Sequence, residues 1–235
     1  MSAVPFVWNG WLPLGWCEGT APVALRRIRP DDAAALQGFV RALSPASRRL
    51  RFHAALNELP EATLNALTSV DQSQHVAFVL TLTEHGAERI VGEARYAMCS
   101  DRETAEFGIV VADALQGQGL AERLLAALLD AARAAGLRWL VGEVLAGNAR
   151  MLAFIRRCGF AATTHGVEPG LVRVERSVER SLPAAHAASR TGIGRCRIRR
   201  LLAGLWPAAR ESGSVLQPKP ISWPLPTPLL PTPDT

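Results

Sequence analysis

The sequence of 235 residues has few of the features that build metal centres, disulfide frameworks or membrane spans. Its four cysteines lie far apart without a Cys-x-x-Cys pair, and no histidine cluster has ligand spacing. This scarcity argues against a zinc site and favours reduced thiols in a cytosol. No run reaches the roughly 18 apolar residues of a membrane-spanning helix. The apolar start lacks a basic stretch and is interrupted by Asn9 and Pro13, unlike a secretory signal peptide. We therefore expect a cytoplasmic protein without a metal or a membrane partner.

Lysine is almost absent, since Lys219 is the only lysine among 26 basic residues. The formal net charge is +5, but its distribution is uneven. Residues 1–183 contain 19 arginines and 19 acidic residues, which cancel, whereas residues 184–235 contain seven basic and two acidic residues. The basic excess belongs to the end of the chain, so no specific nucleic-acid partner is expected.

The hydrophobic pattern divides the chain into three zones. Residues 1–22 carry Pro, Gly and Trp without periodicity and predict an irregular leader. Residues 23–182 alternate strand and helix patterns and predict one domain. Residues 183–235 are basic and then proline-rich, which favours a disordered tail because proline lacks a backbone donor.

Elements within the predicted domain follow the periods of strands and helices. Strands are expected at 23–29, 75–84, 89–99, 103–112, 137–145, 160–165 and 171–180. Helices are expected at 30–43, 44–52, 59–70, 120–136 and 148–159. This order predicts a mixed α/β (α+β) fold with a largely antiparallel sheet flanked by helices.

The segment QGQGLA (116–121) stands between a strand that ends near Val111 and a leucine-rich helix. Glycine lets the backbone approach a ligand and adopt positive φ. The first amides of a helix have no partner within the helix, and with the helix dipole they suit a pyrophosphate. A bare Gly-x-Gly is also common in tight turns that bind nothing, so the loop alone does not establish a phosphate-binding site.

The loop resembles the acetyl-CoA-binding motif of the GNAT superfamily of N-acetyltransferases, Q/R-x-x-G-x-G/A, at Gln116, Gly119 and Ala121. A second GNAT motif, an Asn followed by a helix that ends in Gly-Phe, is matched by Asn148 and Gly159-Phe160. A Rossmann dinucleotide site is excluded because no third glycine or ribose-binding acid follows at the required spacing.

The resemblance covers about residues 23–182 and implies the GNAT fold, with acetyl-CoA as co-substrate and no metal. Segments 43–79, 105–125 and 140–160 resemble the catalytic domain of Pat-type bacterial protein lysine acetyltransferases. The chain is too short for the large modules fused to many of those enzymes, which favours a free-standing catalytic domain. The cofactor-binding residues implied are Ile109, Val110, Val111, Gln116, Gly117, Gln118, Gly119, Leu120, Ala121 and Asn148.

Glu106 lies in the strand before the loop, where Pat-like and histone-acetylating enzymes place a general base. An amine is nucleophilic only when neutral, so a carboxylate that removes an ammonium proton is the group needed. The alternative is an outward-facing Glu106 in solvent, because strand pleat alone does not identify the cleft face. Glu93 and Glu143 are rival carboxylates, each expected to be an ordinary strand acid facing water. Glu143 is the stronger rival, since its strand is expected to border the acetyl group.

One position departs from the GNAT motif pattern, and several other polar residues have no assigned catalytic role. Many GNAT enzymes place a leaving-group acid, a tyrosine, four residues before the Gly-Phe, where this chain has Ile155, so no general acid is implied. Tyr96 and Cys158 are expected to be packed residues rather than catalysts. The arginine run is expected to border the substrate groove and attract an acidic patch, or to form a solvated face. The run comprises Arg48, Arg49 and Arg51.

The expected reaction is direct transfer of acetyl from acetyl-CoA to a primary amine, with Glu106 as base and a main-chain amide around Ile109–Val111 polarising the carbonyl. A protein lysine is one acceptor that the resemblance implies. A small-molecule amine and a non-catalytic acyl-CoA-binding module remain the alternatives.

Overall fold

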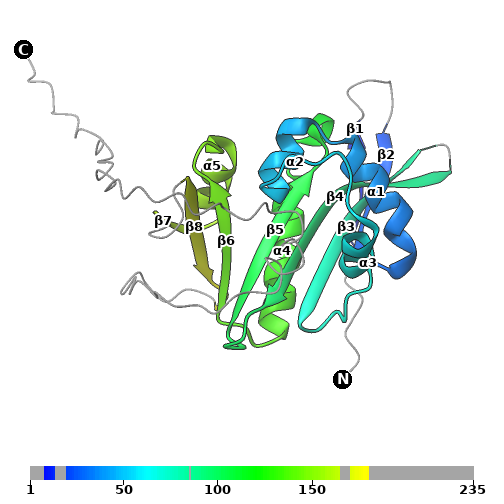
Figure 1. Ribbon diagram of the computed structural model, residues 1–235. Coiled ribbons are helices and arrows are strands. Elements are labelled where there is room, and N and C mark those ends of the chain that lie inside the picture. Colours follow the sequence, from blue (N-terminus) through cyan, green and yellow to red (C-terminus); the bar gives the residue numbers. More distant parts are fainter. Residues whose placement is uncertain (1–7, 14–19, 85, 165–169, 180–235) are drawn as a thin grey trace, which may run out of the picture.

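The computed structural model describes residues 8–13, 20–84, 86–164 and 170–179 (Figure 1). The predicted tail at 183–235 lies outside these residues. Within them, an eight-stranded sheet has the order β1-β2-β3-β4-β5-β6-β8-β7. The strands are β1 (Trp8–Pro13), β2 (Thr20–Arg27), β3 (His75–Glu84), β4 (Ala87–Met98), β5 (Thr104–Val111), β6 (Trp139–Leu145), β7 (Ala161–Thr164) and β8 (Leu171–Ser177).

Helices connect the strands where the sequence predicts them. They are α1 (Ala33–Ala42), α2 (Pro45–Phe52), α3 (Glu61–Thr68), α4 (Leu120–Ala134) and α5 (Ala149–Arg157), with short 3-10 helices η1 (Pro30–Asp32) and η2 (Asp113–Leu115). Neighbouring strands pair antiparallel, except that β5 and β6 pair parallel. The expected mixed and mostly antiparallel sheet flanked by helices is confirmed.

The expectation of an irregular leader over residues 1–22 is wrong at β1. This strand pairs antiparallel with β2, from Trp8 opposite Leu25 to Pro13 opposite Thr20. An edge strand tolerates proline because one side of its backbone needs no ladder hydrogen bond. The mixed composition of the segment therefore concealed an edge strand, and the sheet begins before the predicted boundary at residue 23.

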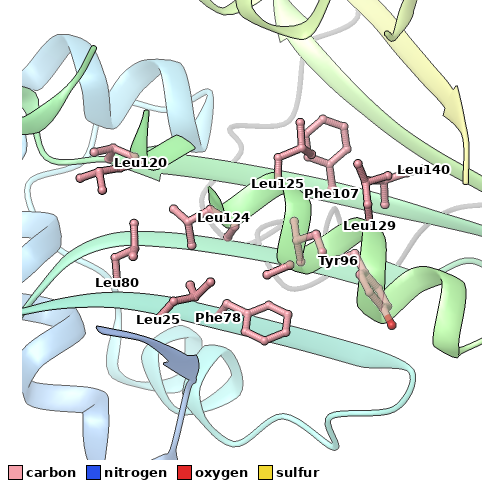
Figure 2. Packing of buried hydrophobic residues seen from close by; sticks show 14 of the residues in the cluster. Leu25, Phe78, Leu80, Tyr96, Phe107, Leu120, Leu124, Leu125, Leu129 and Leu140 are labelled. Atoms are coloured by element: carbon pink, nitrogen blue, oxygen red, sulfur yellow. The ribbon is translucent and has the colours of Figure 1, made fainter. Parts of the chain in front are cut away.

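Each face of the sheet packs a separate apolar cluster. On one face, α4 packs leucines at positions such as Leu124 and Leu128 against β3, β4 and β5. Figure 2 shows Leu124 and Leu125 pointing toward side chains of the strands, among them Leu80 and Phe107. On the other face, α1, α2 and α3 cover a second cluster. The sheet is therefore buried on both sides in its centre.

The strands β5 and β6 separate along their length. They pair only from Thr104 opposite Trp139 to Glu106 opposite Val141. Beyond that point β5 continues to pair with β4 up to Val111, while β6 continues to pair with β8 up to Leu145. The two strands therefore diverge toward the ends that lead into α4 and α5, as Figure 1 shows.

Candidate active site

A cavity of about 890 Å³ lies where β5 and β6 diverge. Its walls come from both strands, from α2, from the loop before α4, from the start of α4 and from α5. Ligand pockets in proteins are typically about 300–1,000 Å³. The gap in the sheet is thus a ligand-sized site, bounded by backbone that lacks a strand partner on one side.

The glycine loop opens into this cavity at the start of α4. Gly117 and Gly119 have φ of 87° and 77°, a region that side chains other than glycine rarely adopt. Gly119 is the N-cap of α4, and a Cβ there would meet no atom within 4 Å. The amide of Arg123 donates to the Gly119 carbonyl at 3.3 Å, which leaves the three preceding amides without partners inside the helix. An anion in the cavity can accept hydrogen bonds directly from these amides.

The structure brings the predicted cofactor residues together, with one exception. Gln118 is exposed and does not line the cavity. The predicted residues that do line it are Ile109, Val110, Val111, Gln116, Gly117, Gly119, Leu120, Ala121 and Asn148. Contact with acetyl-CoA stays a prediction for each of them.

The pairing of β5 with β4 decides which amides face the gap. Cys99 N donates to Thr104 O at 2.7 Å and Ala112 N donates to Val91 O at 2.8 Å, which fixes the alternation at both ends. In an antiparallel ladder, every second residue bonds the neighbouring strand. The Val110 amide is therefore directed toward β4, while those of Ile109 and Val111 point toward the gap.

Asn148 lines the cavity but also has a structural task. Its side chain is the N-cap of α5 and accepts a hydrogen bond from Met151 N at 3.1 Å. Such a cap supplies a partner for one of the open amides at the helix start. The position of this asparagine in the second motif is thus explained by helix α5 itself.

The glutamates Glu106 and Glu143 share one wall. Along β5, Phe107 and Val111 pack in the α4 cluster, so the alternation of a strand puts Glu106 on the opposite face. On β6, a Cβ at Gly142 would lie 2.8 Å from the Phe107 ring, so Gly142 faces α4 and Glu143 faces away from it. Both glutamates are partly exposed and line the cavity where the strands separate. Both remain candidate bases.

Glu93 does not face water as expected, since it is 3% exposed. Its carboxylate accepts from Arg51 Nη2 at 3.1 Å and from Arg95 Nε. Burial alone would raise the pKa of Glu93, but the charges of Arg95 and Arg51 hold it below its usual range. Sequence patterns missed this pair because Arg51 and Glu93 are far apart in the chain. A carboxylate held in this way is a structural counter-ion rather than a base.

His75 extends this buried cluster. Arg95 Nη1 donates to Leu67 O at 3.0 Å and lies 3.2 Å from His75 Nε2. Arginine has only donors, so His75 Nε2 is the acceptor in this contact. The cluster of Arg51, Arg95 and Glu93 holds two cations and one anion, and of these three residues only Arg51 lines the cavity.

The three arginines of α2 have different surroundings, and Arg51 is the one that lines the cavity. Arg48 is buried and donates to the carbonyls of Arg41 and Leu43, which closes the end of α1. The guanidinium of Arg51 lies 2.9 Å from the position of a Cβ on Gly108, where any side chain would displace it. Only Arg49 of the three is exposed. Arg51 thus connects α2 to β4 and β5, while Arg48 connects it to the end of α1.

Ile155 and Tyr96 lie in the core, and Cys158 is partly buried against it. Ile155 is fully buried in the α4 cluster, so its place supplies no acid to the cavity. Tyr96 is 1% exposed, and burial raises its pKa to about 12. Burial also raises the pKa of the Cys158 thiol, with a further contribution from Glu122. Neither side chain lines the cavity.

Asp113 connects the segment before the glycine loop to the start of α2 through hydrogen bonds. It accepts from Ser44 N at 2.9 Å, Ser44 Oγ at 3.0 Å and Ser47 Oγ at 2.6 Å. Burial pushes the pKa of Asp113 up, but these hydrogen bonds lower it on balance. The start of α2 is thereby fixed to the segment that leads into the glycine loop.

The sequence and the fold are similar to those of known acetyltransferases. Residues 23–161 match the family described as "Acetyltransferase (GNAT) domain". The chain belongs to this family and is an acetyl-CoA-dependent acetyltransferase. An acetyltransferase of Pseudomonas aeruginosa is 36% identical over 138 residues, which are 59% of this chain and 74% of the relative.

Two further similarities concern the kind of acetyltransferase. The GNAT domain of S. lividans PAT has a TM-score of 0.61 and 29% identity, over 72% of this chain and 97% of that structure. An L-methionine sulfoximine/L-methionine sulfone acetyltransferase of Pseudomonas aeruginosa is 32% identical over 108 residues, 44% of this chain and 63% of the relative. The similarity to Pat-type catalytic domains, predicted from segments such as 43–79, is confirmed.

The described residues contain neither a membrane-spanning helix nor a cluster of metal-ligating side chains. None of the helices placed in them is long and apolar enough to cross a membrane. Within the same residues, no group of three or more His, Cys, Asp or Glu side chains is arranged to hold a metal ion.

Proposed function

We propose that this acetyltransferase transfers the acetyl group directly to a primary amine, with Glu106 as general base. The observation that carries the proposal is the position of Glu106 at the last paired residue of β5 before β6 diverges. Its carboxylate lines the cavity on the face covered by α2, opposite the apolar cluster under α4. A base at this point lies in the same cavity as the amides of Ile109 and Val111, which point toward the gap between β5 and β6.

The residues present fit acetyl-CoA. The open amides after Gly119 suit its pyrophosphate, and the amides of Ile109 and Val111 suit its narrow thioester arm. Bound acetyl-CoA supplies an activated acetyl group and a thiolate leaving group. The amide of Ile109 or Val111 donates to the thioester carbonyl oxygen, while Val110 is committed to β4.

Glu106 receives the proton that the acceptor ammonium must lose before attack. Glu143 on the facing strand is the alternative, because it lines the same wall. Glu93 is removed from the candidates by its two arginine partners. The acceptor amine attacks the thioester directly, so the reaction needs no covalent enzyme intermediate.

Two classes of acceptor have support. The similarity to the S. lividans PAT domain favours a protein lysine, since Pat-type enzymes modify lysines. The relative named for L-methionine sulfoximine and L-methionine sulfone favours the α-amine of a small amino acid. A non-catalytic acyl-CoA-binding module is the alternative outside catalysis, and the replacement of the family tyrosine by Ile155 is its support.

A turnover assay with acetyl-CoA and a panel of amines tests these alternatives. The panel contains a lysine peptide with a blocked N-terminus, L-methionine sulfone and a simple alkyl amine, and release of free CoA thiol is followed. We expect acetylation of at least one amine, with the product identified by mass spectrometry. Tight binding of acetyl-CoA without turnover on any amine would favour the binding module and contradict the proposal.

A further inference from the structure

We propose that Arg150 is a cofactor-binding residue that clamps the pyrophosphate of acetyl-CoA from the side opposite to α4. The inference rests on the proposed placement of this pyrophosphate at the start of α4. It adds a charged side chain to a phosphate site whose other donors are backbone amides. The guanidinium comes from α5, so both helices that follow the diverging strands take part.

The position of Arg150 follows from the divergence of the sheet. Helix α4 follows β5 and helix α5 follows β6, so the two helix starts lie on the two sides of the cavity. Arg150 Nη1 donates to Gln116 Oε1 at 2.8 Å. Its Nη2 lies 3.5 Å from the position of a Cβ on Gly117. The guanidinium is therefore held over the glycine loop, and it lines the cavity.

Gln116 positions this arginine instead of neutralising it. The side-chain amide of Gln116 donates from Nε2 to Val111 O at 3.1 Å while its Oε1 accepts from Arg150. The glutamine thus links the end of β5 to the start of α5. Because its amide is uncharged, the positive charge of Arg150 stays available for an anion.

The charges around the loop support this assignment. Among the residues that the structure describes, no carboxylate forms an ion pair with Arg150. Arg157, two turns further along α5, also lines the cavity but lies 3.8 Å from Glu122 Oε1. Arginine presents its donors in a planar fork that matches phosphate oxygens. Arg150 is thus a cation at the glycine loop without a charged partner among the described residues, and its donors other than the one bound to Gln116 can bind the pyrophosphate.

The test is the affinity for CoA of the full chain carrying Arg150→Met, measured by calorimetry. Hydrogen bonds to charged groups are strong enough that we expect about 10- to 100-fold weaker binding. Dephospho-CoA, which keeps the pyrophosphate but lacks the 3′-phosphate, should lose the same factor. S-acetylpantetheine, which lacks the nucleotide, should bind both proteins equally in ligand-observed NMR.

Two further variants separate the possible failures. Arg156→Met removes an exposed arginine of α5 that does not line the cavity and should change CoA affinity less than about twofold. Gly119→Glu puts a negative side chain at the start of α4 and should abolish CoA binding. If folded Gly119→Glu binds CoA normally, the placement of the pyrophosphate itself is wrong. If only Gly119→Glu loses binding, the placement holds and the role of Arg150 is refuted.

Comparing CoA, dephospho-CoA and S-acetylpantetheine shows which part of the cofactor Arg150 contacts. An equal loss for S-acetylpantetheine in Arg150→Met would mean that the arginine only supports the local structure. A loss seen with CoA and absent with dephospho-CoA would move the contact to the 3′-phosphate. Either result overturns the assignment to the pyrophosphate.

Discussion

On one face of the sheet, α4 packs a row of leucines against apolar strand residues, whereas the opposite face carries buried charges where it meets α2. Leu124 and Leu128 are fully buried among other apolar side chains. Glu93 and Arg95 are almost as deeply buried, and the carboxylate of Glu93 pairs with both Arg95 and Arg51. The apolar face thus anchors the helix that follows the glycine loop, while the charged face forms the wall beside Glu106.

The difference shows how this fold separates stability from chemistry. Apolar packing is insensitive to pH and tolerates small shifts, whereas buried ion pairs depend on exact partners and on ionisation. Polar groups near the cavity are kept in place by other polar groups, as Asp113 and Gln116 also illustrate. Substitutions on the two faces should therefore differ in kind as well as in size.

The largest effect is expected for Glu106→Gln on the charged face. Removing a general base typically lowers the rate by about 10²–10⁴-fold. The variant should bind acetyl-CoA normally and lose turnover near neutral pH, because the amide cannot accept the ammonium proton. The loss should shrink as the pH rises toward the acceptor's own pKa, roughly 10.4 for a lysine. A pH–rate profile of both proteins with one acceptor measures this.

Glu143→Gln is the matched control for Glu106→Gln, since both carboxylates line the same wall. Equal rates of wild type and Glu106→Gln across pH 6–9 would exclude Glu106 and transfer the role to Glu143 if that variant is slow. A uniform loss at every pH would show that Glu106 positions the acceptor without taking its proton.

The next effect concerns stability and compares the two faces directly. Glu93→Gln leaves the charges of Arg51 and Arg95 uncompensated, and breaking a buried pair costs about 3–5 kcal/mol. Because the folded pKa of Glu93 is lowered, its contribution is present above the usual carboxylate pKa and is lost as pH falls through the folded value. Urea unfolding at pH 7 and at lower pH should therefore show a shrinking difference from wild type.

Leu124→Ala on the apolar face is the control for Glu93→Gln. It should cost about 2–5 kcal/mol through the lost contacts and the cavity left behind. Leu124 has no ionisable group, so this loss should stay the same at both pH values. A loss in Glu93→Gln that is equally independent of pH would contradict the electrostatic account of the charged face.

The apolar face and the glycine loop could be predicted because their signals are local. The leucines at 120, 124 and 128 repeat with the period of a helix, and Gly119 is the residue whose positive φ begins α4. Each element of the core domain was found at nearly its observed place for the same reason. The edge strand β1 was missed because Gly10 and Pro13 weaken its pattern.

The charged face could not be predicted because its contacts join distant segments. Arg51 meets Glu93 only after α2 packs across β4 and β5, and nothing in either segment alone indicates the pairing. Arg150 stands two residues after Asn148 in the second motif, but its contact with Gln116 exists only once β5 and β6 diverge. Composition indicates which residues are charged, while only the fold indicates which of them are partners.

The smallest effect is expected where the charged face joins the glycine loop, at Asp113. Asp113→Asn removes a carboxylate that accepts hydrogen bonds from Ser44 and Ser47. Ser44→Ala removes the hydrogen bond from Ser44 Oγ and the side-chain N-cap of α2, but it keeps the backbone amide that donates to Asp113. Loss of an N-cap costs about 1 kcal/mol, so Ser44→Ala should lower the urea midpoint modestly. The pKa of Asp113 is lowered in the folded protein, so its contribution is present above the usual aspartate pKa and fades as pH falls through the folded value. The difference between wild type and Asp113→Asn in urea midpoint should therefore narrow below about pH 4, since the usual aspartate pKa is about 3.9. Both proteins keep the other carboxylates, so the difference isolates Asp113. An unchanged difference at low pH would mean that the contact depends on hydrogen-bond geometry alone and that ionisation contributes nothing.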